Sequence, residues 1–405
     1  MTIKCPGCGA ALVYDAVSGK MLCTHCVTYY GEQEIGTYTQ EKDKFDNIQE
    51  DSAGNGESEK NRADEDEFEC EIYKCTNCGA ELAINDTESS TFCAYCGQPT
   101  IVMSRIVRQK KPQGIIPFEI TKQQALQILR NKLNKGFFVP KEVKDVQIDK
   151  VHGIYIPYKV YNIDYEDEMV LSGVVGTGKS ARIKHYYRHA KINFENITMD
   201  ASVMLDDESS IRLEPYNFFK CVPFSQIYMS GFYSNIKDDD EDRLKEGALV
   251  RASNMFDEQV KKTVHADEVK VQKHNPCVNI NAERYVMLPA WFVSFRHNGV
   301  NNTIMVNGQT GKCVGAVEED KKKKSIFFWT VAAVLIPVFY IIINLVVKYF
   351  SSEGQEVDAF KLLGLGLVLI FATAFGISSK FEDSRKLTKA DTMKRFANDR
   401  QEGDE

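Results

Sequence analysis

The chain has 405 residues, enough for two or three domains, and its apolar fraction of 43% and charged fraction of 26% lie near globular averages. The net charge of −7 argues against a general nucleic-acid binder, which usually carries a basic surface. The first residues, MTIKCPG, contain no apolar run, so we expect no cleaved signal peptide.

One cysteine pattern occurs twice near the N-terminus. Residues 5–26 and 75–96 both read C-x2-C, then fourteen residues, then C-x2-C, with Gly-Ala after the first pair. Zn²⁺ prefers four soft ligands in a tetrahedron, and each C-x2-C turn, or knuckle, brings two thiolates together. The gap is slightly shorter than in the usual zinc-ribbon spacings. We expect two structural zinc ions in two ribbons, with the ligand sets Cys5, Cys8, Cys23, Cys26 and Cys75, Cys78, Cys93, Cys96.

The alternatives are disulfide pairs or unpaired core thiols. Two identical spacings in one chain, together with a reducing compartment, favour metal over disulfides. Three glycines follow knuckles where left-handed backbone suits a residue without Cβ: Gly9, Gly79 and Gly97. The second knuckle of the first ribbon lacks such a glycine, so we expect a less regular site there. The other cysteines have no obvious partner and are expected to stay reduced: Cys70, Cys221, Cys277 and Cys313.

The composition divides the N-terminal part into a first ribbon at 1–32, an acidic linker at 33–69 and a second ribbon at 70–104. Between Glu41 and Glu71 there are thirteen Asp or Glu and four Lys or Arg. Such a segment buries too little apolar surface to offset its ordering entropy, so we expect a disordered linker.

Residues 105–320 read as a mixed α+β domain with a mostly antiparallel sheet. Thr121 is a good N-cap for a helix that ends near Gly136, and 238–264 has acids first and lysines last, as a helix dipole favours. Strands are expected at 153–165, 190–197, 283–297 and 303–306, followed by a tight turn at 307–311. Pro157 suggests that the first of these is an edge or bulged strand. A similar phrase around Pro289 indicates either a weak duplication or a shared local requirement.

Residues 173–180, GVVGTGKS, match the phosphate-binding P-loop pattern. Lys179 would then hold phosphates, Ser180 a magnesium ion, and Asp206-Asp207 would be the acidic partner. A P-loop follows a buried strand and opens a helix, whereas here an acidic segment precedes and a strand-like one follows. We therefore expect a glycine-rich hairpin turn. On the strand after it His185 and His189 would lie about 13 Å apart, and we find no catalytic constellation.

Two apolar runs near the C-terminus predict a transmembrane hairpin rather than two buried core helices. The spans are 326–347 and 362–379, joined by a short external loop at 348–361 and followed by a charged cytosolic tail at 380–405. Lysines at 321–324 precede the first span and four basic residues follow the second, so the positive-inside rule places both termini in the cytoplasm. Neither run contains a charge, which argues against a channel or transporter.

The paired knuckles, the phrases IIPFEI and GIYIPYKVY, and YVMLPAWFV before VNGQTGKCVG together carry a resemblance over nearly the whole chain. The chain resembles bacterial membrane-anchored proteins with TFIIB-type zinc ribbons. Some of these are associated with SPFH-domain and phage-shock-type envelope-stress proteins. The resemblance implies a scaffold at the bacterial cytoplasmic membrane, and only the eight cysteines carry over as site residues.

The leading hypothesis is therefore a non-enzymatic, membrane-anchored zinc-ribbon adaptor that recruits membrane or membrane-associated proteins and has no small-molecule substrate. A four-thiolate site leaves no open coordination position, so zinc supplies folding energy. The first alternative is a membrane-tethered regulator that binds nucleic acid through its ribbons, and the second is a P-loop nucleotide hydrolase.

Overall fold

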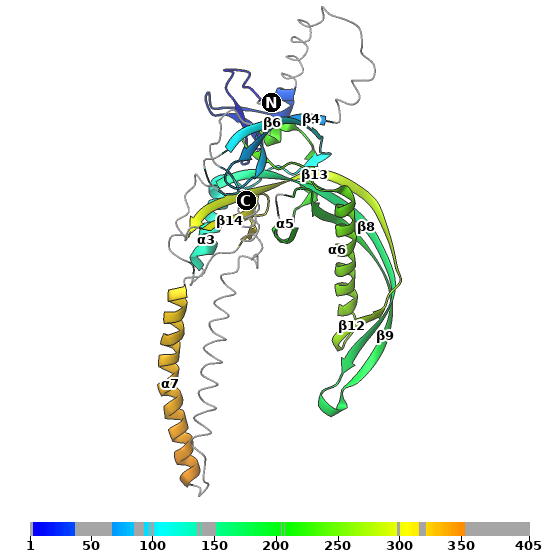
Figure 1. The fold of residues 1–405 in the computed structure, drawn as a ribbon, viewed down its shortest axis with the longest axis vertical. Helices are drawn as coiled ribbons and strands as arrows, with labels where there is room; N and C mark the ends of the chain where they lie inside the picture. The colour runs from blue at the N-terminus through cyan, green and yellow to red at the C-terminus, as the bar shows by residue number, and fades with distance from the viewer. Residues whose placement is uncertain are drawn as a thin grey trace, which may run out of the picture.

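The computed structural model describes residues 3–36, 67–84, 93–96, 98, 101–135, 139, 151–203, 205, 207–297, 300–315 and 321–352. These residues form a small first ribbon, a large sheet domain that includes the second ribbon, and one long helix that projects away from the sheet domain (Figure 1). The predicted linker at 33–69 lies mostly outside the described residues.

The first ribbon is a three-stranded antiparallel sheet of β1 (Leu12–Asp15), β2 (Lys20–Cys23) and β3 (Thr28–Tyr30). A short helical turn at 32–36 follows it. Leu12, Met21 and Ile35 form its core beside two cysteines, Cys5 and Cys23. This core is small, so a bound metal would supply much of the ribbon's stability.

A twelve-stranded sheet forms the body, in the order β10-β7-β13-β8-β11-β5-β4-β6, with β9, β12, β14 and β15 paired off this path. All its pairs are antiparallel except β7 with β13 and β11 with β8, which confirms the mostly antiparallel prediction. The strands are β4 (Glu67–Cys75), β5 (Glu81–Ile84), β6 (Ile101–Lys110), β7 (Gly114–Ile115), β8 (Val151–Val175), β9 (Arg182–Asp200), β10 (Val222–Pro223), β11 (Tyr233–Ser234), β12 (Asp267–Lys273), β13 (Pro276–His297), β14 (Val300–Asn307) and β15 (Cys313–Val314).

The second ribbon is continuous with this sheet. Its central strand β4 pairs with β5 on one side and with β6 on the other, and β5 also pairs with β11 of the body. These strands span Glu67 to Lys110 and so extend beyond both ends of the predicted range 70–104. The second ribbon is therefore built into the body rather than suspended from a linker.

The strand that contains Pro157 lies in the middle of the sheet, so the prediction of an edge strand was wrong. The strand is irregular, as the bulged alternative expected, but its register shifts with β9 and β13 lie at 161–163 and not at Pro157. Pro157 pairs with Met287 of β13 without a register shift at that point. On the other side, β11 pairs with β8 up to Tyr155 and β9 begins to pair at Tyr158. The carbonyl oxygen of Pro157 accepts from the backbone N–H of Ala201 at 2.9 Å. The proline thus lies where one neighbouring strand gives way to another, and its missing N–H disturbs no regular ladder.

The two proline phrases are related by an approximate local two-fold axis. Tyr155 lies opposite Pro289, and Pro157 lies opposite Met287. The short strand β7 runs parallel to β13 just before Pro289, as β11 runs parallel to β8 just before Pro157. The pairing of β13 with β14 begins one residue after Pro289, and the pairing of β8 with β9 begins one residue after Pro157. The chain therefore repeats one arrangement, β7-α3-β8-β9 and β11-α6-β13-β14, in which each half lends its short strand to the other.

Helices α3 (Lys122–Lys135) and α6 (Glu241–Lys262) pack against this sheet. The predicted N-cap is confirmed, because Thr121 Oγ1 accepts from the Gln124 N–H at 3.2 Å and Gln124 Oε1 accepts from the Thr121 N–H at 2.8 Å. In α6 the acids of the first turn and the lysines of the last turn follow the expected dipole pattern. The long strands curve around α6 (Figure 1).

Alternate residues of β8 face two separate apolar layers. Tyr155 packs in the cluster that includes Leu129 of α3, and Tyr161 packs in the cluster that includes Phe256 of α6. On the opposite side, Tyr158 packs with the short helix α5 (Asp207–Leu213) and with Ala94 of the second ribbon. The sheet is thus covered on both faces where the ribbons join it.

The long helix α7 (Lys321–Ser352) contains Pro337 and is the one described helix long and apolar enough to cross a membrane, over Ser325–Ile342. It covers the predicted span 326–347 and extends into the predicted loop at 348–361. The second predicted span, 362–379, and the tail at 380–405 lie outside the described residues.

Candidate metal centres

Eight cysteines converge in two groups of four, as the repeated spacing predicts. Within each group every Sγ atom lies within 4.8 Å of the others. The closest contacts in the first group are 3.7 Å for Cys5–Cys26 and 3.5 Å for Cys8–Cys23. In the second group they are 3.6 and 3.7 Å, for the pairs Cys75–Cys96 and Cys78–Cys93.

These distances fit a tetrahedral metal site and exclude disulfide bonds in this structure. A disulfide needs a sulfur–sulfur distance of about 2.05 Å, and all twelve cysteines are free thiols. A tetrahedron with Zn–S bonds of about 2.3 Å has edges of about 3.8 Å. The four donors of each group would therefore hold a tetrahedral thiophilic ion such as Zn²⁺ with small adjustments.

The two centres differ in exposure. All four cysteines of the second group are buried, with exposed fractions of 7% or less. In the first group Cys5 and Cys23 are buried, but Cys8 and Cys26 are exposed to solvent. A chelator or an oxidant therefore has direct access only to the first centre.

Crowding shifts the acidity of these thiols. Hydrogen bonds with Cys75, Cys78 and Cys96 raise the pKa of Cys93 far above its ordinary value. Burial opposes the ionisation of Cys5, but hydrogen bonds with the Tyr30 hydroxyl and nearby backbone N–H groups lower its pKa to about 6. Four thiolates packed together repel one another, so full deprotonation of either group needs a bound cation.

The backbone of each knuckle explains why glycine recurs there. Gly9 and Gly79 have φ of +75° and +69°, and their N–H groups donate to the carbonyl oxygens of Cys5 and Cys75 at 2.9 Å. Val27 occupies the corresponding place after the second knuckle of the first ribbon and also takes a positive φ, +56°. A β-branched residue is strained in this conformation. The Val27 N–H also donates to the Cys23 carbonyl oxygen, at 2.8 Å, so this knuckle keeps the regular backbone geometry at a cost in strain and is not the irregular site we expected. Gly97 lies outside the described residues.

The second centre is fastened to the sheet through Tyr95, which lies between two of its ligands. The Tyr95 hydroxyl donates to Asn235 Oδ1 at 2.9 Å, and its ring lies 5.2 Å from that of Phe292. Its carbonyl oxygen accepts from the hydroxyls of Ser294 at 3.0 Å and Thr303 at 2.6 Å. A metal at this centre would therefore stabilise the body and not only the ribbon.

The first ribbon docks on the loop at 225–231 of the body. Tyr14 packs edge-to-face against Tyr228, with ring centroids 5.3 Å apart, and the Tyr14 N–H donates to the Ser230 carbonyl oxygen at 3.1 Å. The Tyr228 hydroxyl donates to Glu32 Oε2 at 2.8 Å. A Cβ at Gly231, where φ is +85°, would lie 2.9 Å from Val13 Cγ1. The contact is close but small, which makes this ribbon the more detachable of the two.

The P-loop-like segment lies at the tip of the β8–β9 hairpin. Strand β8 ends at Val175, a 3-10 turn covers Gly178–Ser180, and β9 begins at Arg182. The segment therefore opens a strand and not a helix, as the hairpin prediction requires. Asp207 begins α5, and Asp206 lies outside the described residues. His189 is bonded to Glu166 at 2.9 Å rather than to His185, so the two histidines form no joint site.

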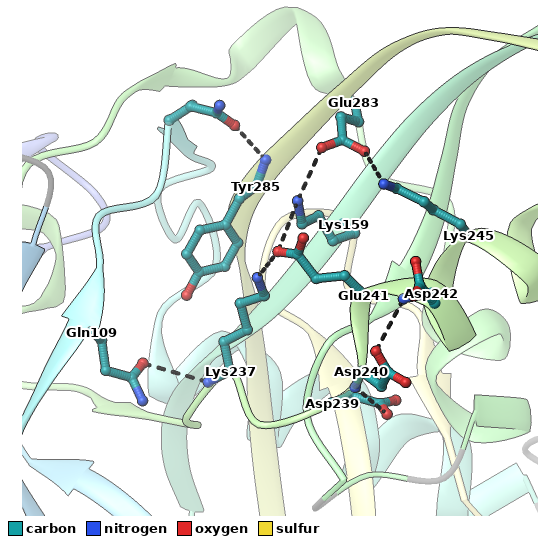
Figure 2. Close-up of polar contacts among 11 residues, drawn as sticks. Gln109, Lys159, Lys237, Asp239, Asp240, Glu241, Asp242, Lys245, Glu283 and Tyr285 are labelled. Atoms are coloured by element: carbon teal, nitrogen blue, oxygen red, sulfur yellow. Dashed lines mark hydrogen bonds and ion pairs between the residues drawn. The ribbon is translucent and has the colours of Figure 1, made fainter.

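A charged cluster surrounds Lys159, which is only 5% exposed (Figure 2). Its Nζ lies 3.4 Å from Glu241 Oε1 and 3.5 Å from Glu283 Oε1. Lys237 also bonds to Glu241, and Lys245 lies 3.7 Å from Glu283. Each carboxylate is thus shared by two lysines, with Lys159 common to both, and the cluster connects β8, β13 and the start of α6.

A pocket of about 440 Å³ opens beside the C-terminal end of β9, next to Asn196 and Thr198. Its wall includes Glu214, whose carboxylate lies 2.5 Å from Arg251 Nη2, and Arg284, which bonds to Asn196 Oδ1 at 2.5 Å. Glu214 is therefore held in an ion pair, whereas Arg284 is held by a neutral side chain.

Sequence reasoning predicted that the eight cysteines converge in two groups but missed the residues that seat the ribbons. Tyr95 and Asn235 are far apart in the chain, and nothing in their local sequence indicates contact. The remaining cysteines are also free: Cys70 and Cys313 are buried, Cys221 is half-buried and Cys277 is exposed.

Comparison with known proteins gives one distant relative and no function. A protein of Bacillus subtilis (strain 168) with the printed name "Uncharacterized protein YdjG" is 28% identical over 303 residues, which cover 60% of this chain and 89% of the relative. No model of a known protein family and no solved structure matches the chain. The chain is thus similar to a Bacillus protein and has two four-cysteine clusters compatible with zinc ribbons.

Proposed function

We propose that the chain is a non-enzymatic, membrane-anchored adaptor with two TFIIB-type zinc ribbons that recruits protein partners to the bacterial cytoplasmic membrane. Two C-terminal spans hold it there with both termini in the cytoplasm. The partners are membrane or membrane-associated proteins of the kind that handle envelope stress.

The metal chemistry supports a structural role. Four cysteine sulfurs fill the tetrahedral coordination of a zinc ion and leave no position for water or substrate. Burial of the second group, together with its bonds to the body, supports a role in folding and not in partner capture.

The observation that carries the adaptor proposal is the open edge of the sheet at β6. Among the described strands β6 pairs only with β4, along ten residues from Ile101 to Lys110. Val102, Met103 and Ile106 on this strand are 52%, 54% and 60% exposed. A long apolar edge strand is a template for another strand, and soluble proteins usually protect such edges. An extended segment of a partner protein fits this edge by strand addition.

The two arginines on β6 are paired with acidic side chains of the neighbouring strands. Arg105 forms a bidentate pair with Glu81, with distances of 3.2 and 2.7 Å, and Arg108 lies 3.0 Å from Glu69. Both arginines are thus turned toward acids of the same ribbon. Between Val102 and Arg108 a partner segment would meet apolar side chains and ion-paired arginines, and the exposed Lys110 lies at the end of the strand.

Crosslinking in intact membranes, followed by identification of the captured proteins, tests this function. The double variant Val102→Glu with Ile106→Glu should lose the partners that the native chain captures. Val250→Glu is the matched control, because Val250 on α6 is 56% exposed, close to Val102. Capture that survives in the double variant, or is lost equally in the control, would contradict recruitment through β6.

A further inference from the structure

The pocket beside the C-terminal end of β9 is formed by three separate parts of the body. Strand β9 contributes Glu195 and Asn196, β13 contributes Arg284, and residues 214–219 supply much of the remaining wall. The volume of about 440 Å³ lies within the range of small-molecule sites, roughly 300–1,000 Å³. The lining residues include no cysteine of the metal centres and no residue of β6. The function proposed above therefore makes no use of this pocket.

Arg284 brings a cation without a carboxylate partner to the pocket. Its Nη2 donates to Asn196 Oδ1 at 2.5 Å, and its guanidinium lies 6.0 Å from the centre of the Phe218 ring. Both of these partners are neutral, and within the described part of the chain the guanidinium forms no ion pair. Arginine has five N–H donors, so most of them remain for a ligand. A carboxylate is the acceptor that best matches these donors.

Asn196 is fixed in an uncommon backbone conformation beside this cation. It has φ of +58°, and its backbone N–H donates to Asn162 Oδ1 at 3.0 Å. The register of β8 and β9 shifts at this point. Residues held in such conformations are often found at ligand sites, because the surrounding structure determines their geometry. The Asn196 side chain uses its oxygen to accept from Arg284, which leaves its NH2 group as a further donor.

An acid and an aromatic ring add two other kinds of group to the pocket. Glu195 is exposed and forms no ion pair with any residue that the structure describes. Glu214, by contrast, is held by Arg251 at both carboxylate oxygens. Phe219 is 99% exposed, although large apolar side chains are usually buried. The pocket therefore offers a free cation, a free anion and an uncovered aromatic surface.

The approximate two-fold axis of the body relates this pocket to the place where the second ribbon joins the sheet. Asp200 of β9 and Asn307 of β14 occupy equivalent positions, and each side chain accepts from the backbone N–H two residues ahead, at 3.0 and 2.9 Å. Strand β10 pairs with β7 as β5 pairs with β11. The residues that lead into β10 thus stand where the other half has the second ribbon.

In that other half, Tyr95 fills the place equivalent to the pocket. The hydroxyls of Ser294 and Thr303 donate to the Tyr95 carbonyl oxygen, and the Tyr95 ring packs on another aromatic ring. By the two-fold relation, these two hydroxyl residues are equivalent to Asn162 and Asn196. The second ribbon thus presents an aromatic ring with a carbonyl oxygen beside it. An aromatic amino acid carries the same two features, and its carboxylate and ammonium groups match the two free charges of the pocket.

We propose that this pocket binds a free aromatic α-amino acid. Arg284 and Asn196 donate to its carboxylate. Glu195 accepts from its ammonium group, and its ring packs against Phe219. The bound molecule joins the segment before β10 to the long strands β9 and β13, as Tyr95 joins the second ribbon to the sheet. Because the site is separate from β6, the adaptor proposal does not depend on it.

Isothermal titration calorimetry of the full-length chain in detergent tests the assignment. L-phenylalanine should bind, and three analogues that each lack one recognised group should bind at least about tenfold more weakly: 3-phenylpropionate, phenethylamine and L-alanine. Glu195→Gln should abolish the preference over 3-phenylpropionate, which lacks the ammonium group. Arg284→Met should abolish the preference over phenethylamine, which lacks the carboxylate, and Phe219→Ala should reduce the preference over L-alanine.

Two exposed substitutions outside the pocket are the controls and should leave binding unchanged. Glu246→Gln on α6 matches the change at Glu195, and Tyr187→Ala, at a residue of β9 that is 61% exposed, matches the change at Phe219. Glu195 and Phe219 are themselves exposed, so their variants should keep the unfolding midpoint of the native chain and test the site even if Arg284→Met fails to fold.

Three results would overturn the assignment. The first is failure of L-phenylalanine, L-tyrosine and L-tryptophan to bind at millimolar concentration. The second is a preference for L-phenylalanine over its analogues that persists in all the folded pocket variants. The third is binding of N-acetyl-L-phenylalaninamide as tight as that of L-phenylalanine, because this compound lacks both charges and imitates a residue inside a protein segment.

Discussion

The Tyr95 hydroxyl lies 2.7 Å from the side-chain nitrogen of Asn235, although 140 residues separate the two in the chain. Tyr95 stands between two cysteines of the second metal centre, and Asn235 directly follows β11. The bond therefore couples the metal centre to the middle of the sheet. Since it is largely buried, its loss leaves a polar group without a partner.

Tyr95→Phe should therefore lower the free energy of unfolding of the body by about 1–2 kcal/mol. Urea titration of the purified chain measures this, and zinc content per chain should not change. Tyr29→Phe is the control, because Tyr29 is 47% exposed on the first ribbon and should have little effect. An unchanged midpoint for Tyr95→Phe would show that the contact contributes nothing to stability.

A chelator should remove the metal ion of the first centre before that of the second. Cys8 and Cys26 are exposed, whereas every ligand of the second centre is buried, so a chelator should remove the first ion much sooner. Release followed with a colorimetric zinc indicator should show two phases of equal amplitude. The variant Cys5→Ser with Cys8→Ser should abolish only the fast phase, and a single phase from the native chain would contradict the assignment.

Val27→Gly should strengthen the first centre. Val27 has φ of +56° and is 72% exposed, so glycine relieves backbone strain without removing a core contact. The gain should be about 1 kcal/mol, and it should appear as slower loss of the first metal ion to a chelator. Val17→Gly, at a position 74% exposed, has no strain of this kind to relieve and should not slow the loss.

Gly231→Ala should detach the first ribbon from the body. The new Cβ would lie 2.9 Å from Val13 Cγ1 at a residue with φ of +85°, so the loop at 225–231 would have to shift. Limited proteolysis should then cleave near residues 32–36 several times faster, because strain of about 1–3 kcal/mol opposes docking. Gly36→Ala meets no atom within 4 Å and is the control. Equal cleavage rates in native and Gly231→Ala chains would argue against this docking contact.

Stability at low pH should depend on Glu241. The hydrogen bond with Lys237, and next the charge of Lys159, lower the pKa of this carboxyl from 4.5 to about 2. A carboxyl with a lowered pKa stabilises the fold above its unfolded pKa of about 4.5, and this stability is lost as the pH falls through about 2. Glu241→Gln should therefore flatten the fall in unfolding free energy between these values. Glu246→Gln, on the exposed side of α6, should leave the profile unchanged.

Local patterns predicted the parts of this fold that depend on neighbouring residues. Cysteine spacing located both four-cysteine clusters, and the Thr121 cap located the start of α3. The glycine-rich turn between β8 and β9 followed from the strand-like residues on both sides of it.

The sheet order could not be predicted in the same way, because it depends on contacts between distant segments. Strands β7, β10 and β11 have only two residues each, too few for a periodic pattern. Pro157 was expected at an edge because proline lacks an N–H. The missing N–H, however, removes a hydrogen bond to only one of the two neighbouring strands. The register places that side where β11 ends and β9 begins, which no local rule could reveal.

The exchange of short strands between the two halves sets the order in which this chain can be completed during synthesis. Strand β5 of the second ribbon needs β11 as its neighbour, and β7 needs β13, so neither is covered until residues far downstream have left the ribosome. The four thiols from Cys75 to Cys96 emerge long before that point. Metal capture there would keep the nascent ribbon compact and its sheet edge in register until Tyr233 and Ser234 arrive to close it.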